Sequence, residues 1–396
     1  LRHCTLELSI WNVASFFSKI DRFDSKMGDR PIWVLLLLGL ASIPLIPWAP
    51  FFGYDLYNIQ VYHKCPPVQW NPYLPESVQC GDHAGRSMPY PPLLYFSFIW
   101  TKYLSPATSK IIWGVVLIAL MSGSLLWWLR QEREDRKQIS RQDLAFGLLL
   151  LLQFPFIFTL ERANSDVPVV ALWTVATWAA TKNRWAVAGM AAGAAVTFKI
   201  YPIIALGVIS LGTVITLAKE KLRKHGLVLG LVSALTMFIG FYLLWPQDIW
   251  NNWLVTIGGY NTGGSGTFYY SHTLSRPFGG KYWIPALIIR TALFGIFVWA
   301  TKAKIKTDPR LVFAGALAMT TYYTGTSYDY NLVTIYPLFI LLYVRKLWSL
   351  LGIGLFFVCM ARPLFVQSPG VQILGQIGWL MLIALYCSTS NRTRKI

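Results

Sequence analysis

Charged residues are scarce in this sequence of 396 residues. Asp, Glu, Lys and Arg together make up 13% of it, whereas apolar residues make up 55%. Soluble globular domains carry roughly 25% charged residues, and a chain this size cannot cover a water-facing surface with about half that share. The scarcity excludes a soluble enzyme and a disordered chain, and five cysteines in such a length exclude a small disulfide-rich protein. The composition indicates an integral membrane protein.

Patterns for metal or nucleic-acid binding are also missing. There is no Cys-x-x-Cys pair and no His/Cys cluster, so we expect no structural metal. Only 17 acidic residues oppose 35 Lys and Arg, which gives a net charge of +18. The basic residues form short clusters between apolar runs, and there is no Arg-rich arm. We therefore interpret them as membrane-topology signals rather than a nucleic-acid surface, and expect no nucleic-acid partner.

Apolar runs of about 17–25 residues separate these clusters, which is the length that a spanning helix needs. They predict an all-α polytopic membrane protein with about twelve transmembrane helices. Several runs are short, so one or two could be re-entrant or merged. Segment 93–104 is too short to span and is expected to be an interfacial helix, like part of the amphipathic segment 1–30. The predicted spans are 31–50, 108–129, 144–160, 167–181, 185–198, 201–218, 226–245, 284–301, 311–325, 331–344, 347–361 and 371–388.

The basic residues also predict the orientation of the bundle. With the N-terminus inside, the inside segments hold 25 of the 35 Lys and Arg residues, which favours cytoplasmic positions for both termini. We expect a bacterial inner (plasma) membrane protein. The predicted units are a cytoplasmic segment 1–30, a transmembrane domain 31–388 and a cytoplasmic tail 389–396. The predicted outer segments, facing the periplasm or exterior, are 51–107, 246–283 and 325–331.

The cysteines agree with this orientation. Cys65 and Cys80 both lie in the first outer segment, on the oxidising side of the membrane. A disulfide between them would close a 16-residue loop and stabilise it by about 3 kcal/mol; two free thiols are the alternative. We expect Cys4, Cys359 and Cys387 to be unpaired.

The first outer segment begins and ends with candidate site residues. Asp55, between Tyr54 and Tyr57, follows the proline-rich end of the first span. A carboxylate just outside the bilayer is suited to accept a proton from a hydroxyl; a solvated loop aspartate or an N-cap is the alternative. Tyr90 precedes two prolines that fix the start of the interfacial helix.

Two further polar clusters follow at the outer ends of predicted spans. Dense polarity there is costly and usually marks pairing or binding, although a mutually satisfied turn would also explain the first cluster. In the second, Lys199 could contact a lipid phosphate or snorkel to headgroups, and Tyr201 shapes the turn. The first cluster contains Glu161, Arg162, Asn164 and Asp166.

The later outer segments add to the same face. His272 and Arg276 lie in a Gly- and Ser-rich stretch and are candidate ligands for an anionic group; a disordered loop is the alternative. Tyr328, Asp329 and Asn331 lie in the short segment near 325–331. Carboxylates and cations on one face suit a substrate with hydroxyls and a phosphate, such as a lipid-linked phosphosugar.

The order of these motifs resembles the GT-C glycosyltransferases, and more narrowly the bacterial polyprenyl-phosphate-mannose-dependent alpha-mannosyltransferase family. The resemblance covers about 50–345. It differs at Ala163, where related chains often have glycine, and in the cysteine-bearing loop. The residues that carry it are Asp55, Tyr90 with its two prolines, Glu161 to Asn164, Lys199 to Pro202, and Tyr328 to Leu332.

The resemblance implies a helical bundle with juxtamembrane helices on long outer loops. It also implies an inverting transfer of a hexose, with mannose favoured, from a polyprenyl-phosphate-sugar donor to a glycolipid or glycan acceptor, without a cofactor. Asp55 would be the base, and the cations Lys199, Arg162 and Arg276 would hold the departing phosphate. A secondary transporter or lipid-linked glycan flippase is the alternative; such proteins usually carry polar sites near the bilayer midplane. A non-catalytic scaffold of an envelope-assembly complex is a third.

Overall fold

The structure is a computed structural model, and every regular element in the residues that it describes is helical. This part of the chain therefore confirms the all-α class. The described residues are 15–26, 28–45, 54–66, 70–74, 80, 90–132, 139–217, 230, 232–236, 239–240, 242–244, 246–262, 283–322, 329–360 and 369–389. The elements of the first half are α2 (Arg30–Ser42), α3 (Tyr54–Lys64), α5 (Pro92–Ser97), η2 (Ile99–Tyr103), α6 (Pro106–Glu132), α7 (Arg141–Leu151), α8 (Phe154–Arg162), α9 (Asp166–Thr181) and α10 (Trp185–Phe198). Those of the second half are α11 (Pro202–Leu217), α13 (Gln247–Thr262), α14 (Trp283–Lys304), α15 (Pro309–Thr320), η5 (Asp329–Ile335), α16 (Tyr336–Val344), α17 (Trp348–Leu355), the π-helical η6 (Phe356–Met360) and α19 (Pro369–Thr389).

Among the described residues, three helices are long and apolar enough to cross a membrane, within α6, α14 and α19. A bent pair, α7 and α8, would make a fourth span if both halves count as one. The other apolar helices have 10–17 residues, and at 1.5 Å per residue each of them is shorter than the bilayer's hydrocarbon core of about 30 Å. The helices lie close to the predicted runs, but twelve complete spans stay a prediction.

One predicted span is broken. The apolar run 144–160 was expected to be one helix, but α7 and α8 meet at an angle of 51°. Pro155 lies in the first turn of α8, where a proline is tolerated because the amide it lacks has no helical partner. Gln153 at the break is buried, and its Nε2 donates to the carbonyls of Leu149 (3.0 Å) and Leu36 (3.1 Å). The Gln153 side chain thus binds backbone carbonyls at the break, inside an otherwise apolar bundle.

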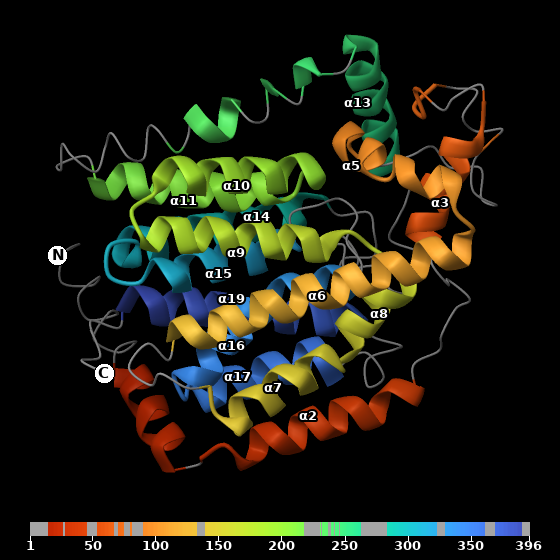
Figure 1. The fold of residues 1–396 in the computed structure, drawn as a ribbon. Coiled ribbons are helices and arrows are strands. Elements are labelled where there is room, and N and C mark those ends of the chain that lie inside the picture. Colours follow the sequence, from red (N-terminus) through yellow and green to blue (C-terminus); the bar gives the residue numbers. More distant parts are fainter. Residues whose placement is uncertain are drawn as a thin grey trace.

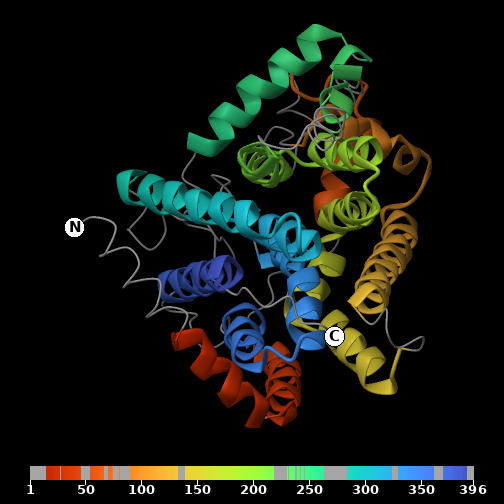
Figure 2. The ribbon, with the colours of Figure 1, turned by 90° about the vertical axis from the view of Figure 1, so that its left-hand side faces the viewer.

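The helices lie alongside one another, with α3, α5 and α13 gathered at one end of the bundle (Figure 1). After a quarter turn, the helices are seen to pack as a bundle at several angles and do not form flat layers (Figure 2). Two buried tryptophans of the core have hydrogen-bonded N–H groups: Trp173 donates to the Phe313 carbonyl at 2.9 Å and Trp128 to Thr174 Oγ1 at 3.1 Å. Packing of this apolar interior holds the helices in place, and the polar groups of the candidate site lie at the ends of these helices.

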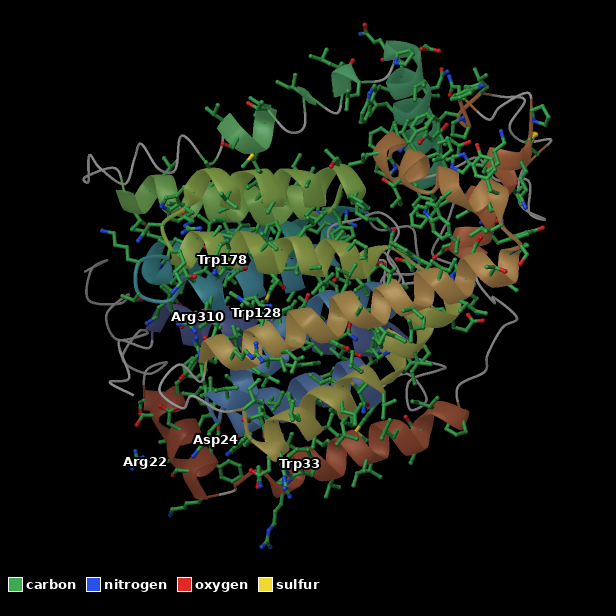
Figure 3. The ribbon with its side chains drawn as sticks, in the orientation of Figure 1. Arg22, Asp24, Trp33, Trp128, Trp178 and Arg310 are labelled. Atoms are coloured by element: carbon green, nitrogen blue, oxygen red, sulfur yellow. A yellow bond between two sulfur atoms is a disulfide. The ribbon has the colours of Figure 1, made fainter. Side chains whose placement is uncertain are left out.

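The end of the bundle that is remote from α3 is closed by ion pairs. Arg345 pairs with Asp308 and with Glu132 (2.9 Å), and Arg310 pairs with Glu132 (3.1 Å). Arg310 and Asp24 lie toward this end, away from α3 (Figure 3). The paired residues come from basic clusters that the sequence predicts on the cytoplasmic side. The structure thus brings together segments that the charge pattern assigns to one face.

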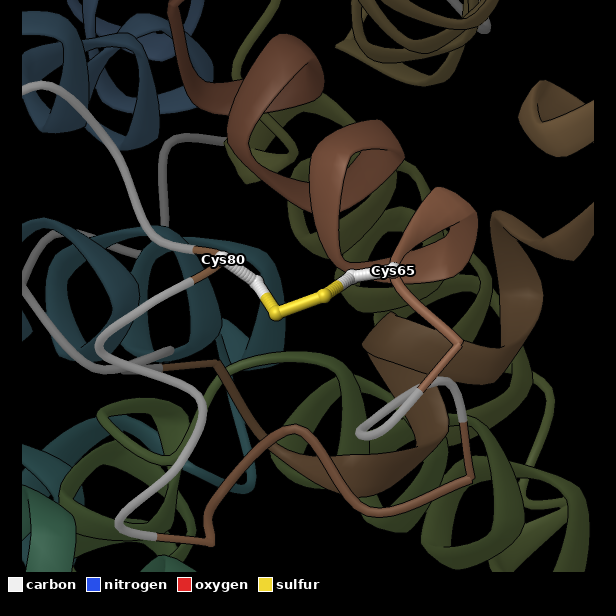
Figure 4. The surroundings of a disulfide bond; sticks show 2 residues. All are labelled: Cys65 and Cys80. Carbon is white, nitrogen blue, oxygen red and sulfur yellow. A yellow bond between two sulfur atoms is a disulfide. The ribbon is translucent and has the colours of Figure 1, made fainter.

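The opposite end carries a second hydrophobic core, separate from that of the bundle. We call the elements that build it the outer cap, after the predicted outer segments 51–107 and 246–283 in which they lie: α3, residues 70–74, α5, η2 and α13. Cys65 and Cys80 form a disulfide in this cap, with their Cα atoms 6.0 Å apart (Figure 4). Cys359 and Cys387 are free and buried, and Cys4 lies outside the described residues. The core of the cap contains Leu56, Ile59, Tyr62, Tyr73, Leu94, Tyr95, Phe98, Ala163, Ile249, Trp250 and Trp253.

Candidate functional site

Asp55 lies in the first turn of α3, where only 4% of its surface is exposed. This burial excludes the solvated loop aspartate that the sequence left open. Further toward the C-terminus of the same helix, Gln60 Nε2 donates to the carbonyls of Thr101 and Leu104, both at 2.7 Å. Lys64 donates to the Leu104 carbonyl at 3.0 Å. These bonds join α3 to the end of η2 and so fix the direction in which Asp55 enters the bundle.

The end of α8 supplies two partners for the Asp55 carboxylate. Arg162 donates from a terminal guanidinium nitrogen to Oδ1, and Asn164 Nδ2 donates to Oδ2 at 2.6 Å. Between them, Ala163 adopts a left-handed conformation (φ 54°, ψ 43°). The backbone N–H of Asn164 then donates to the Thr159 carbonyl at 3.0 Å, a bond that terminates the helix. This turn directs the side chains on both sides of Ala163 toward one carboxylate.

The resulting contacts define what Asp55 can do chemically. Hydrogen bonds between a guanidinium and a carboxylate are among the stronger ones in proteins, so Asp55 is held in one place. A carboxylate offers about four lone-pair positions, and Arg162 and Asn164 use one on each oxygen. Asp55 therefore keeps acceptor positions for the proton of an incoming hydroxyl.

Asp166, in the first turn of α9, is the centre of a second polar group and has no exposed surface. Its Oδ1 accepts from the Tyr201 hydroxyl and its Oδ2 from Asn331 Nδ2, each at 2.8 Å. The backbone N–H of Asp166 donates to Asn164 Oδ1 at 3.0 Å. Because Asn164 also binds Asp55, this one amide side chain links the two carboxylate groups.

Lys199 lies on the edge of the second group. It follows the last residue of α10 in an extended conformation, which turns its side chain away from the helix axis. Its Nζ lies 3.7 Å from Asp166 Oδ1 and 4.9 Å from the centre of the Tyr90 ring. The ammonium thus has a carboxylate on one side and an aromatic face on the other, an arrangement that favours a cation.

The structure brings together most of the predicted site residues that it describes. Asp55, Arg162, Asn164, Asp166, Lys199, Tyr201, Asn331 and Tyr90 form the two linked groups. Glu161 is half-buried beside them and carries a buried oxygen without a hydrogen-bond partner in the described part of the chain. Tyr57 is exposed on α3. Asp329 begins η5, but its side chain is not among those described, and His272, Arg276 and Tyr328 lie outside the described residues.

Several buried polar residues of the outer cap were not predicted, and three of them matter for the structure of the cap. They are Gln60, His63 and Tyr73. His63 Nε2 bonds to the Tyr95 carbonyl at 2.9 Å, and its ring stacks on that of Tyr95 at 4.0 Å. Gln60 and His63 share a helical face of α3 with the apolar residue Leu56, which is the only signal that the sequence offered.

Residues 89–342, more than half of the chain, match the model of glycosyltransferase family 87. The chain belongs to this family. The matched region contains Arg162, Asp166, Lys199 and Asn331 but begins after Asp55. No significant match is found among curated proteins.

Among solved structures, the chain is similar to ArnT from Cupriavidus metallidurans bound to undecaprenyl phosphate. The sequences are 13% identical, the TM-score is 0.40, and the match covers 91% of this chain and 76% of ArnT. The two proteins are distant, so no residue role is transferred from ArnT. Family 87 membership and the apolar helices together support a multi-pass membrane glycosyltransferase.

Proposed function

We propose that this family 87 protein is an inverting hexosyltransferase that uses a polyprenyl-phosphate-sugar donor and Asp55 as its general base. The observation that carries the proposal is the buried Asp55 carboxylate, held by Arg162 and Asn164 and linked through Asn164 to the Lys199 group. In one polar site, Asp55 can accept a proton and Lys199 can bind a phosphate.

In the proposed reaction, an acceptor hydroxyl gives its proton to a carboxylate oxygen of Asp55. The acceptor oxygen forms a bond to the anomeric carbon of the donor sugar while the bond from that carbon to the phosphate oxygen breaks. The electron pair of the broken bond leaves with the phosphate. The products are an inverted glycoside, polyprenyl phosphate and a protonated Asp55, which returns its proton to water.

The cations support the departure of the phosphate. Polyprenyl phosphate is a stable anion, so no strong general acid is needed. Developing negative charge is stabilised best by a cation already held in position, and Lys199 has this property because Asp166 and Tyr90 flank it. Arg162, which the sequence suggested as a second phosphate ligand, pairs with Asp55, and we assign it to orienting the base.

We favour mannose as the sugar and the outer face of the membrane as the site of transfer, to an envelope glycolipid or glycan. The sugar follows from the resemblance to mannosyltransferases. The face follows from the distribution of basic residues, which are concentrated in the segments assigned to the cytoplasm.

The test is sugar transfer by purified protein in lipid vesicles. The assay offers a panel of polyprenyl-phosphate hexoses, the corresponding nucleotide sugars, and a membrane glycolipid extract as acceptor. We expect transfer from a polyprenyl-phosphate hexose and none from a nucleotide sugar. Transfer from nucleotide sugars alone would overturn the donor assignment. No transfer, together with substrate-dependent flux in sealed vesicles, would favour the transporter or flippase.

A further inference from the structure

Tyr90 links the outer cap to Lys199. Its ring faces the Lys199 ammonium, 4.9 Å from the ring centre, and its carbonyl oxygen accepts a hydrogen bond from the Tyr73 hydroxyl at 2.6 Å. Pro91 follows in an extended conformation, and a residue before proline has few backbone conformations to choose from. A bond that fixes the Tyr90 carbonyl therefore restrains the backbone from which the Tyr90 ring projects toward Lys199.

Tyr73 is itself held firmly. Only 4% of its surface is exposed, within the core of the outer cap. Its amide donates to Asn71 Oδ1 at 3.3 Å, and Asn71 Nδ2 donates to Asp248 on α13 at 3.4 Å. Burial raises the pKa of the Tyr73 phenol well above its usual range, so the hydroxyl keeps the proton that it donates to Tyr90.

The segment that carries Tyr73 is closed by the disulfide between Cys65, next to the end of α3, and Cys80 (Figure 4). In the sequence, this cysteine-bearing loop differs from the family that the chain resembles, and the sequence assigns it no function. In the structure it leads from the helix that carries Asp55 to the tyrosine that holds Tyr90.

We infer that Tyr73, in the stretch of chain closed by the Cys65–Cys80 disulfide, is a positioning residue that holds the Tyr90 ring against the Lys199 ammonium and so shapes the subsite for the donor's phosphate. The inference rests on the proposed function, because it takes Lys199 as the phosphate ligand. Tyr73 acts only through Tyr90. Its loss should weaken phosphate binding without changing the chemistry at Asp55.

The test measures binding of polyprenyl phosphate, the proposed leaving group, to the full-length protein in detergent. Tyr73→Phe removes only the hydroxyl, and one such hydrogen bond supports an increase in Kd of about threefold to tenfold. Tyr90→Leu, which removes the ring that faces Lys199, should raise Kd at least as much. Tyr103→Phe is the matched control, because Tyr103 is an exposed tyrosine of the same cap.

Steady-state kinetics give a second readout. Tyr73→Phe should raise the KM for the donor by a similar factor while the acceptor KM and kcat stay near wild type. A Cys65→Ser/Cys80→Ser protein should change in the same direction. Unchanged Kd and donor KM in Tyr73→Phe, even with a lower thermal stability, would reduce Tyr73 to a structural role and overturn the inference.

The outcomes separate this inference from the proposed function. If the protein binds polyprenyl phosphate in a Tyr73-dependent manner but transfers no sugar, the subsite stands and the transferase assignment fails. If it transfers sugar and Tyr73→Phe changes neither Kd nor donor KM, only the inference fails. If wild type does not bind polyprenyl phosphate, both are wrong.

Discussion

At the scale of single residues, the outer cap depends on buried polar side chains whose charge state follows from their surroundings. Burial is the main cause that lowers the pKa of His63 from 6.5 to about 4. The hydrogen bond to the Tyr95 carbonyl opposes this effect, and the charge of Lys102 adds to it. His63 is therefore neutral at neutral pH, with its Nε2–H assigned as the donor to Tyr95.

The lowered pKa of His63 predicts a pH dependence of stability. The unfolded chain binds this proton more tightly than the folded protein, so the contribution of neutral His63 is complete above about pH 6.5 and decreases as the pH falls toward 4. His63→Gln keeps a donor for the Tyr95 carbonyl but cannot become charged. Between about pH 7.5 and about pH 5, the thermal unfolding midpoint of wild type should fall further than that of His63→Gln. Parallel curves would contradict the assignment.

At the scale of elements, the C-terminal end of α8 explains a difference from related sequences. Ala163 has φ 54°, a left-handed conformation that costs a non-glycine residue about 1–2 kcal/mol. Related chains often have glycine here, which adopts this conformation freely. In this chain the alanine methyl is buried in the core of the outer cap, which offsets part of the backbone cost.

Substitutions at Ala163 test whether this turn positions the site. Ala163→Gly relieves the backbone cost but loses a buried methyl and gains unfolded-state entropy, so we expect transfer within about twofold of wild type. Ala163→Val places a β-branched side chain in a conformation that it strongly disfavours. The valine variant should misdirect Arg162 and Asn164 and lower transfer at least about tenfold. Equal activities of the two variants, measured on folded protein, would show that the turn does not control the site.

Other features of the elements show the limits of prediction from sequence. The break between α7 and α8 had a visible signal in Pro155, but an apolar run alone does not say whether proline kinks a helix or starts a new one. The helical position of Asp55 was missed because the first outer segment is polar, and its helix is stabilised by contacts with η2 rather than by its own sequence pattern. Tertiary contacts decided both cases.

At the scale of the whole molecule, the sequence predicted which segments carry the site but not how they pair. Hydropathy and basic clusters assign Asp55 and Arg162 to the same face, and the structure brings them into contact across 107 positions of sequence. The same holds for Asp166 and Asn331, which are 165 positions apart. Such pairings depend on how the helices pack, and no local pattern encodes them. Tyr73 carried no signal because its role arises from one contact with a backbone carbonyl.

The orientation of the bundle is a further prediction at this scale. Tyr103, in the outer cap, and Thr307, at the remote end, are both exposed. In a Cys4→Ser background, Tyr103→Cys should react with a membrane-impermeant maleimide in intact spheroplasts. Thr307→Cys should react only after the membrane is permeabilised. The reverse pattern would place the proposed site on the cytoplasmic side.

The most direct test of the account is sugar transfer by Asp55→Asn in reconstituted vesicles. The amide preserves the size of the side chain but cannot accept the proton, so transfer should fall by at least about 100-fold while the protein stays folded. Asp29→Asn is the matched control, because Asp29 lies at the start of α2, away from the site, and an asparagine oxygen can also accept the hydrogen bond that Trp33 Nε1 donates to Asp29 Oδ2. Loss of transfer in Asp55→Asn alone is the predicted result. Near wild-type turnover in that variant would contradict the claim that Asp55 is the base.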